Sequence, residues 1–415
     1  MLILDFLYAL ILLCTFPFWV KYIFKKKYRR LLKDRLRPQI PTCLAKTIWI
    51  HAVSVGEVRS LKSLIKLLGE QKQQVILSVT TPSGYEFACK EYPGLCVIHS
   101  PLDLSFSIRR FIGCINPKLV IFNELEVWPN WISLLHRKKI PMLLINGRIS
   151  EAAFSRYRFF SFFLWRFFRK IDCFMVQNNI YKQRFQQLKI PAEKIIVCGN
   201  IKADEADRSL KKLPARQEVL AHLRLDSLPK KIITLASSHL GSEAIVIPAI
   251  ERLSADFFFI IVPRHVQRAK TIARQLELSG LKYVFFSQAQ PINSDTQVLI
   301  YDRMGYLFPI MSITDIVFMG GTHDQKIGGH NLYEPAAMGK LILGGPFYNN
   351  FPDIGSELEA SGVYHQINHS DKLVDFAKRY KDLDLKKINE KALKAVLKRK
   401  GSLACILEQI QRFIG

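Results

Sequence analysis

The chain has 415 residues, with 60 Lys and Arg against 35 Asp and Glu, a formal net charge of +25 and 49% hydrophobic residues. One ordinary core rarely extends over so many residues, so the length predicts two domains of roughly 180 residues each plus an anchoring segment. The positive charge would suit a nucleic-acid-binding protein. The sequence has no zinc-finger, RNA-recognition or helix-turn-helix pattern, which argues against that class.

The first predicted element is a membrane-spanning helix over residues 2–20. This segment is apolar apart from Asp5 and is long enough to cross a hydrocarbon core of about 30 Å. Six cations follow it: Lys21, Lys25, Lys26, Lys27, Arg29 and Arg30. Cations on that side predict a single membrane pass with the main part of the protein in the cytoplasm. Asp5 and Pro17 weaken this assignment, so a helix buried in the body of the protein is the alternative.

Apolar β-branched runs then alternate with helical patterns. The strands predicted in the first half cover residues 47–53, 74–80, 96–99, 119–123, 142–146, 173–177 and 195–198. Such alternation is typical of parallel, doubly wound sheets covered by helices on both faces. The segment 202–229, rich in Lys, Asp, Arg and Pro, predicts a connection between two domains.

A carboxylate is predicted at the end of the first of these strands. The turn Ser54-Val55-Gly56-Glu57 interrupts the strand pattern, and a helical pattern follows. Open α/β sheets bind ligands at the carboxyl ends of their strands, so Glu57 is a candidate general base. An acidic residue that only favours a helix N-terminus would have the same position, and this alternative stays open.

Residues 154–170 combine aromatic and cationic side chains. One stripe at helical spacing consists of Phe160, Phe163, Leu164, Phe167 and Phe168. Its flanks hold Arg158, Arg166, Arg169 and Lys170. The pattern predicts a helix lying at a membrane surface, with a core helix as the equally compatible alternative. Residues 1–200 contain 31 Lys and Arg against 12 Asp and Glu, an excess that favours contact with anionic lipids.

The second half repeats the alternation and adds a glycine loop. Its predicted strands cover 232–236, 257–262, 283–286, 298–301, 316–319 and 341–343. After 316–319 come Gly320-Gly321-Thr322 and then Gly328-Gly329-His330-Asn331-Leu332-Tyr333-Glu334-Pro335-Ala336. Glycines let backbone N–H groups approach a phosphate, a helix N-terminus favours anions, and Glu334 can reach ribose hydroxyls. This segment predicts a nucleotide-sugar site, against the alternative of a plain strand-to-helix turn.

Cysteine and metal-ligand patterns indicate neither a disulfide framework nor a metal site. The eight cysteines are dispersed: Cys14, Cys43, Cys89, Cys96, Cys114, Cys173, Cys198 and Cys405. Without a Cys-x-x-Cys pair they predict reduced thiols in a cytoplasmic protein. The single Asp-x-Asp pair, Asp382 and Asp384, lies in a charged helical tail, and the histidines lack metal-ligand spacing. We therefore expect no metal and no cofactor.

Six motifs, in this order, resemble the transferases of 3-deoxy-D-manno-octulosonic acid (Kdo), which move Kdo from CMP-Kdo to lipid A precursors. The motifs are His51 to Glu57, Glu124 to Asn130, Gly199 to Lys202, Pro263 to His265, Asp302 to Gly305, and Gly328 to Ala336. Two positions depart from the family pattern. Asn123 stands where an apolar residue is usual, and Tyr306 stands where an acidic residue is frequent.

The resemblance implies the GT-B glycosyltransferase architecture, with two Rossmann-like lobes facing across a cleft behind the N-terminal membrane helix. With the strand pattern it divides the chain into an anchor (1–24), an acceptor-binding domain (25–210) and a CMP-Kdo-binding domain (211–415). It gives Glu57 the role of base and Glu124 and Lys202 assisting roles, with Glu126 as the alternative within the Glu-x-Glu pair. The implied CMP contacts are Pro263, Arg264, Met304, Gly305, Tyr306, Asn331, Leu332, Tyr333 and Glu334.

The activity implied is an inverting, metal-independent transfer of Kdo from CMP-Kdo to a lipid A precursor in lipopolysaccharide biosynthesis. The expected partners are these two substrates and the anionic lipids of the inner membrane, not nucleic acid. Two other hypotheses remain: a GT-B enzyme that uses a UDP-sugar, and a non-catalytic basic membrane-binding protein.

Overall fold

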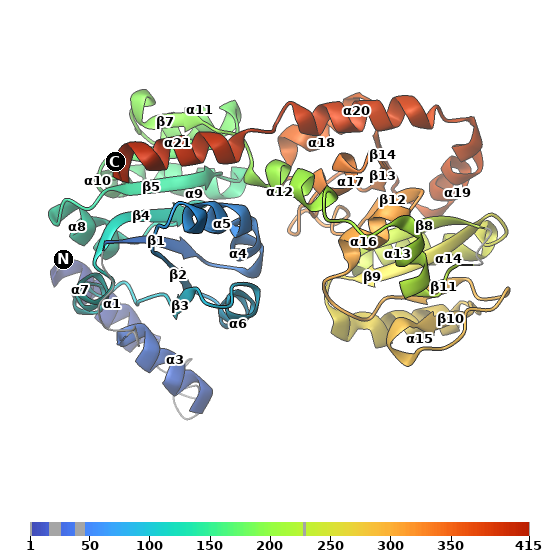
Figure 1. The fold of residues 1–415 in the computed structure, drawn as a ribbon, viewed down its shortest axis with the longest axis horizontal. Coiled ribbons are helices and arrows are strands. Elements are labelled where there is room, and N and C mark those ends of the chain that lie inside the picture. The colour runs from blue at the N-terminus through green and yellow to red at the C-terminus, as the bar shows by residue number, and fades with distance from the viewer. Residues whose placement is uncertain (1, 16–25, 38–45, 227–229, 415) are drawn as a thin grey trace. The chain divides into compact units, whose positions relative to one another are not determined.

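A computed structural model describes residues 2–15, 26–37, 46–226 and 230–414 (Figure 1). The chain divides into two compact α/β units. The first contains residues up to 205 together with 400–415, and the second contains residues 206–399. Each unit is built around its own parallel sheet.

The first unit has a seven-stranded sheet in the order β3-β2-β1-β4-β5-β6-β7. Its strands are β1 (Thr47–Ala52), β2 (Val75–Val79), β3 (Cys96–His99), β4 (Pro117–Asn123), β5 (Met142–Gly147), β6 (Cys173–Val176) and β7 (Ile195–Val197). Its helices are α1 (Leu2–Cys14), α3 (Lys26–Leu36), α4 (Val55–Ser60), α5 (Lys62–Glu70), α6 (Pro82–Glu91), α7 (Ser105–Ile115), α8 (Pro129–Arg137), α9 (Glu151–Phe159), α10 (Ser161–Phe168), α11 (Asn179–Gln187), η1 (Ala192–Lys194), α12 (Ile201–Leu210, which continues into the second unit) and α21 (Ser402–Ile414). All neighbouring strands are parallel, with Ile50 of β1 between Leu77 and Ile121 in register.

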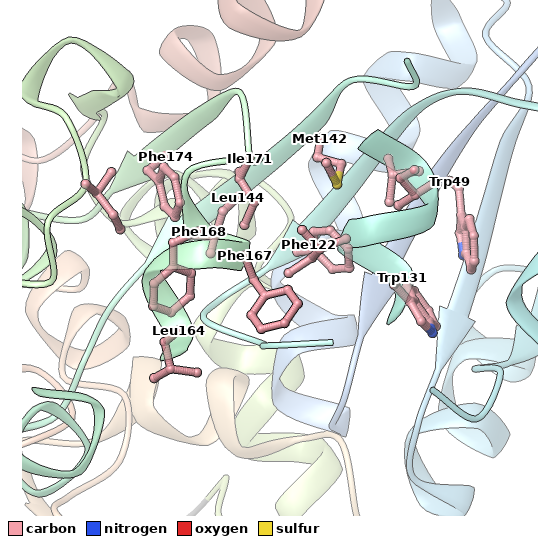
Figure 2. Close-up of a cluster of buried hydrophobic side chains, with 14 of the residues drawn as sticks. Trp49, Phe122, Trp131, Met142, Leu144, Leu164, Phe167, Phe168, Ile171 and Phe174 are labelled. Atoms are coloured by element: carbon pink, nitrogen blue, oxygen red, sulfur yellow. The ribbon is translucent and has the colours of Figure 1, made fainter. Parts of the chain in front are cut away.

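Both faces of this sheet are buried, because successive side chains of a strand point to opposite faces. On one face Trp49 packs with Trp131 of α8 at a ring-centroid distance of 4.6 Å. Figure 2 shows this layer, in which Leu164 and Phe168 of α10 also lie. The other face buries Ile48 and Ile50 with side chains of α4, α5 and α21. The sheet is therefore a rigid platform for the loops at its carboxyl ends.

The second unit has a seven-stranded parallel sheet in the order β10-β11-β9-β8-β12-β13-β14. Its strands are β8 (Lys231–Ser238), β9 (Phe257–Pro263), β10 (Tyr283–Phe285), β11 (Val298–Ile300), β12 (Ile316–Met319), β13 (Leu341–Gly344) and β14 (Tyr364–Gln366). Its helices are α13 (Arg216–Leu223), α14 (Leu240–Leu253), η2 (Val266–Arg268), α15 (Ala269–Leu278), η3 (Phe286–Gln288), α16 (Leu307–Ile313), α17 (Tyr333–Ala337), α18 (Pro352–Ala360), α19 (Ser370–Lys378), η4 (Arg379–Asp382) and α20 (Leu385–Leu397). Two apolar clusters cover its two faces.

The C-terminal helix corrects the predicted domain boundary. We expected residues 211–415 to form one domain, but α21, drawn in red in Figure 1, belongs to the first unit. Its apolar face, which includes Leu403, Ile406 and Ile410, is buried in the core of that unit. The carboxylate of Asp204 in α12 accepts hydrogen bonds from the N–H groups of Gly401 (2.9 Å) and Leu403 (2.8 Å), where α21 begins. A partner so distant along the chain leaves no local signal.

The prediction of reduced thiols is wrong for one pair of cysteines. Cys198, directly after β7, and Cys405 in α21 form a disulfide with their Cα atoms 5.5 Å apart. They are separated by 207 residues, so their proximity depends on the return of α21. Five cysteines of the described part of the chain are free: Cys14, Cys89, Cys96, Cys114 and Cys173. Cys43 lies outside the described residues.

The N-terminal helix differs from the predicted span. α1 has 13 residues, and no helix among those described is long and apolar enough to cross a membrane. The rest of the predicted span, residues 16–20, and the cations Lys21 and Lys25 lie outside the described residues. Asp5 accepts hydrogen bonds from the N–H of Ser105 (2.9 Å) and the side chain of Asn130 (3.0 Å). The polar residue that interrupts the apolar segment thus attaches α1 to the first unit.

The aromatic segment 154–170 has both buried and exposed aromatic side chains. It forms α9 and α10, and Leu164, Phe167 and Phe168 are buried in the core. Phe159 and Phe162 are 83% and 73% exposed. The core interpretation therefore holds for one side of α10, while the other side remains apolar and open to solvent.

Candidate active site

Two carboxylates of the first unit flank the point where its strand order reverses. From β1 the chain moves through β2 to β3, and it then returns to place β4 on the other side of β1. In open α/β sheets ligands bind outside the carboxyl ends of the strands at this switch point. Glu57 lies in α4 just after β1, and Glu124 directly follows β4.

The Glu57 carboxylate turns back onto the loop that precedes its own helix. One oxygen accepts from the N–H of Val53 (3.0 Å) and the other from the hydroxyl of Ser54 (3.1 Å). Burial, followed by the negative charge of Glu124, raises the pKa of Glu57 to about 7, although both hydrogen bonds oppose this shift. Near neutral pH such a carboxylate can both take and release a proton, as a general base requires.

Glu124 has a strained backbone that its neighbours hold in place. Its φ of 62° lies in the left-handed region, which costs a residue other than glycine about 1–2 kcal/mol. Its N–H donates to the carbonyl of Ile145 (2.9 Å), and its carboxylate pairs with Arg148 (2.7 Å). Non-glycine strain of this kind gathers at functional sites.

Arg148 is a site residue that the sequence analysis missed. It follows the adjacent strand β5 and pairs with Glu124, and the neighbouring carboxylates hold its pKa above the usual value despite its burial. The available signal was the position of Gly147-Arg148 at the end of a predicted strand. No motif marked it as a partner of the Glu-x-Glu pair.

The charge of Glu126 is coupled to the other two carboxylates of the site. Burial and the charge of Glu124 raise its pKa to about 7, similar to that of Glu57. Its charge also contributes to the raised pKa of Glu57. Glu126 therefore stays open, on electrostatic grounds, as the alternative to Glu124 within the Glu-x-Glu pair.

The neighbouring His51 is unsuited to proton transfer. Its ring is fully buried, bonded to the hydroxyl of Ser78 (2.9 Å) and packed on Trp131 at a centroid distance of 4.9 Å. Burial and the charge of Arg35 lower its pKa to about 3, so the ring is neutral. Asn123, the unusual residue before Glu124, is also buried, and its amide lies 3.4 Å from the carbonyl oxygen of Glu57. It supports the backbone of the site.

Lys202 lies in the first turn of α12, after β7 at the same edge of the sheet. Glu205, one turn further along, accepts from the N–H of Ser63 in α5 (2.9 Å), so α12 runs back toward the helices that follow β1. The N–H of Lys202 donates to the side chain of Asn200 (3.0 Å), which in turn donates to Gln177 (3.1 Å). These amides fix the backbone at Lys202.

The second unit has its own switch point, between β8 and β12. Gly320 after β12 packs against the end of β8, where an added Cβ would lie only 2.1 Å from the carbonyl oxygen of Ser237. Ser237 itself has a φ of 53°, again in the left-handed region. The loop then continues to Gly328 and Gly329, both with positive φ, before α17. Only glycine at position 320 permits this close contact.

The predicted nucleotide contacts lie at or after the carboxyl ends of β9, β11 and β12. They differ in how exposed they are to solvent. Pro263 ends β9 and is buried, while Arg264 is exposed. Met304 is 75% exposed, and Tyr306 packs on His222 at a centroid distance of 4.1 Å. Gly305 is exposed and has a φ of 93°.

Around α17 the predicted contacts differ in how they can meet a ligand. The side chain of Asn331 accepts from the N–H of Tyr333 (3.2 Å), and Glu334 is half-buried in the first turn of the helix. Leu332 and Tyr333 are fully buried, and the Tyr333 hydroxyl bonds Asp353 (3.2 Å). Neither residue exposes side chain or backbone to a ligand in this conformation. Within the described ranges, acidic, His and Cys side chains form no group of three or more that could hold a metal ion.

Comparison with known proteins identifies the family. Residues 24–205 match the family described as 3-deoxy-D-manno-octulosonic-acid transferase (kdotransferase). The 3-deoxy-D-manno-octulosonic acid transferase of Haemophilus influenzae is 35% identical over 340 residues, 79% of this chain and 77% of the relative. That of Chlamydia pneumoniae is 30% identical over 381 residues, 89% and 86% of the two chains. A bifunctional glycosyltransferase/methyltransferase of Fusobacterium nucleatum is 31% identical over 362 residues, but the chain spans only 56% of its length.

Solved structures support the fold. A glycosyltransferase from Rickettsia africae has a TM-score of 0.59 at 17% identity, over 90% of this chain and 99% of that one. UDP-GlcNAc 2-epimerase from Neisseria meningitidis has a TM-score of 0.62 at 14% identity, over 89% and 100% of the two chains. These likenesses confirm the predicted class of two parallel-sheet α/β lobes with GT-B-like relatives. With curated relatives 30–35% identical over most of its length, the chain belongs to the 3-deoxy-D-manno-octulosonic acid (Kdo) transferase family of glycosyltransferases.

Proposed function

We propose that the protein transfers Kdo from CMP-Kdo to a hydroxyl of a lipid A precursor, with inversion at the anomeric carbon and with Glu57 as general base. The observation that carries the proposal is the Glu57 carboxylate itself. It is half-buried at the switch point of the first sheet, held by Val53 and Ser54, and has its pKa raised to about 7. The relatives named as Kdo transferases supply the substrate class.

In this reaction Glu57 takes the proton of the acceptor hydroxyl as its oxygen attacks the anomeric carbon of Kdo. The bond from that carbon to the phosphate oxygen breaks, and CMP leaves with the electron pair. A hydroxyl is a weak nucleophile until its proton is removed, so the base contributes roughly 100-fold or more to the rate. Glu124, held by Arg148, keeps the pKa of Glu57 high and thereby strengthens it as a proton acceptor.

Lys202 and the second unit act on the leaving group in this proposal. Negative charge builds on the departing phosphate, which a cation and oriented N–H groups stabilise. The CMP site consists of Arg264, the Met304-Gly305-Tyr306 turn and the segment from Asn331 to Glu334. A donor with one phosphate needs less charge neutralisation than a diphosphate, so we propose that transfer is independent of metal.

The acceptor is a lipid, and we propose that the first unit meets it at the inner membrane. The exposed Phe159, Phe160 and Phe162 form an apolar surface beside Arg166, whose guanidinium lies 5.2 Å from the Phe162 ring centroid. Aromatic rings next to cations suit the interface between headgroups and acyl chains.

Release of CMP tests the proposed function. The purified full-length chain should release CMP from CMP-Kdo when a lipid A precursor is present, and only at the slow background rate when it is absent. Addition of a metal chelator should leave the rate unchanged. Transfer from a UDP-sugar but not from CMP-Kdo would refute the proposal and favour a different GT-B enzyme.

A further inference from the structure

Three histidines meet at the switch point of the second sheet. His239 lies directly after β8, His265 after β9, and His330 in the glycine loop after β12. β8 is the central strand of these three, so their carboxyl ends are adjacent. The Nε2 atoms of His239 and His330 are 2.8 Å apart, and the ring of His265 lies 6.3 Å from that of His239. No step of the mechanism above uses these rings.

The glycine loop determines the position of the His330 ring. A Cβ at Gly321 would lie 3.1 Å from its Nε2 atom, so the ring packs where a side chain is missing. The side chain of Asn350 holds the loop by donating to the carbonyl groups of Ile327 (2.7 Å) and Gly329 (3.0 Å). The pair of rings is therefore part of a built loop and not a chance contact between two mobile side chains.

A nitrogen pair at this distance shares one proton. One ring donates an N–H and the other accepts it, so two imidazolium ions would place two N–H groups face to face. The pair therefore carries at most one positive charge. Adding that charge turns it into a donor for a nearby anion.

The charges around the pair already favour an anion. Arg264, Arg268 and His265, all shortly after β9, act on His239 with positive charge, and Glu243 of α14 acts on it with negative charge. Glu243 is fully buried and is engaged by the Ser238 hydroxyl (2.8 Å) and by Arg268. Burial first, and then the charges of His265 and the two arginines, hold the pKa of His239 below its usual value, with Glu243 in opposition. A bound anion would act against these positive charges and raise the pKa of His239.

The chemistry of the proposed donor supplies such an anion. In CMP-Kdo the anomeric carbon bears both the phosphate ester and the carboxylate of the sugar acid, so a group that binds the carboxylate must adjoin the phosphate site. His330 directly precedes Asn331, the first residue of the segment proposed to bind CMP. We propose that the His239–His330 pair, with His265 beside it, binds the carboxylate of the donor sugar and so selects an acidic 2-keto sugar over a neutral one. This inference rests on the proposed function.

Binding should then be linked to proton uptake. A carboxylate beside the pair stabilises the imidazolium form through a charge-assisted hydrogen bond, so donor binding raises the pKa of His239. The folded free protein holds this group neutral near pH 7, and the complex takes up a proton. Affinity for CMP-Kdo should therefore increase as the pH falls toward 6, whereas affinity for CMP should change less.

Calorimetric titration of the full chain with CMP and with freshly prepared CMP-Kdo tests the inference. The parent should bind CMP-Kdo more tightly than CMP. His239 is the N-cap residue of α14, a position that Asn also favours. His239→Asn and His330→Asn should each lose about tenfold of this preference while the Kd for CMP stays within twofold. His369→Asn is the matched control, because His369 caps α19 and is exposed. Titrations in two buffers of different ionisation enthalpy should show proton uptake in the parent and none in His239→Asn.

Three results would overturn the inference. In the first, both variants keep the preference of the parent. In the second, they lose affinity for CMP and CMP-Kdo by the same factor, which would mean that the pair binds the phosphate. In the third, the parent binds both ligands equally. Failure of the proposed function would give a different result. The parent would prefer CMP-Kdo through the histidines but transfer nothing to a lipid A precursor, which would support the subsite and refute the transferase reaction.

Discussion

The two units are both seven-stranded parallel sheets, with different strand orders, and they place opposite chemistry at their switch points. In the first unit the charges of Glu57, Glu124 and Glu126 act on one another, and Arg148 pairs with Glu124. In the second unit His239 and His330 meet near two arginines around one buried acid, Glu243. A doubly wound sheet thus provides a place for ligands, and the residues after each strand decide which charge that place favours.

Both switch points also contain a residue other than glycine in the left-handed region. Glu124 has a φ of 62° and Ser237 a φ of 53°. Each is held by close backbone contacts, through the carbonyl of Ile145 in one unit and the tight approach of Gly320 in the other. Local strain at both switch points, after the returning strand β4 in one unit and at the end of the first strand β8 in the other, indicates that the turns are fixed before a ligand arrives.

The largest expected effect separates the chemical roles of the two units. Glu57→Gln should lower the rate of Kdo transfer by at least about 100-fold, because an amide cannot accept the proton of the acceptor hydroxyl. Its affinity for CMP should be unchanged, since the proposed CMP site lies in the second unit. Transfer kinetics and a CMP titration measure the two effects. Glu70→Gln, at the exposed end of α5, is the control, and near-normal transfer by Glu57→Gln would move the base to Glu126 or Glu124.

The same substitution should change how stability depends on pH. The pKa of Glu57 rises from 4.5 in the unfolded chain to about 7 in the fold, so its stabilising contribution is complete below pH 4.5 and is lost as pH rises through 7. Relative to the parent, Glu57→Gln should therefore gain up to about 3 kcal/mol of unfolding free energy between pH 5 and pH 8. Denaturant unfolding at both pH values measures this difference. A constant difference between variant and parent would show that Glu57 titrates normally.

Nucleotide affinity should respond only to changes in the second unit. Arg264→Ala and Glu334→Ala should each weaken CMP binding by roughly 1–3 kcal/mol, because each removes a charged hydrogen-bonding group. Fluorescence or calorimetric titration gives the Kd, with Arg274→Ala at an exposed position of α15 as the control. If both variants bind CMP like the parent, the site lies elsewhere in the unit.

Local patterns were sufficient to predict most of both sheets. The strand predicted at residues 47–53 is β1 (Thr47–Ala52), and that at 257–262 is β9 (Phe257–Pro263). Buried parallel strands are continuous apolar runs, which makes them recognisable in a single sequence. The edge strand β14 (Tyr364–Gln366) was missed because it is three residues long and includes polar His365 and Gln366.

What was missed depends on contacts between distant parts of the chain. Glu57 could be placed because its turn directly follows its strand. Arg148 pairs with Glu124 across 24 positions, and His239 contacts His330 across 91. The hydrogen bond that holds the start of α21 in the first unit spans 197 positions, and the disulfide of Cys405 spans 207. Each requires the order of strands in the sheet, which motifs alone do not determine.

The smallest expected effect concerns the surface of the first unit, where the aromatic side chains of α9 and α10 are exposed. Arg166→Gln and Arg169→Gln should each weaken binding of the full chain to anionic vesicles by about 1 kcal/mol, since each cation attracts the lipid headgroups. This binding should decrease with salt, because the attraction is screened beyond about 8 Å at physiological ionic strength. Vesicle sedimentation measures it, and Arg274→Gln in the second unit should have no effect. The opposite result would be vesicle binding that does not depend on salt but is lost in a Phe159→Ser, Phe162→Ser double variant. It would show that the protein attaches by apolar insertion, and the basic excess of the first unit would then have another purpose.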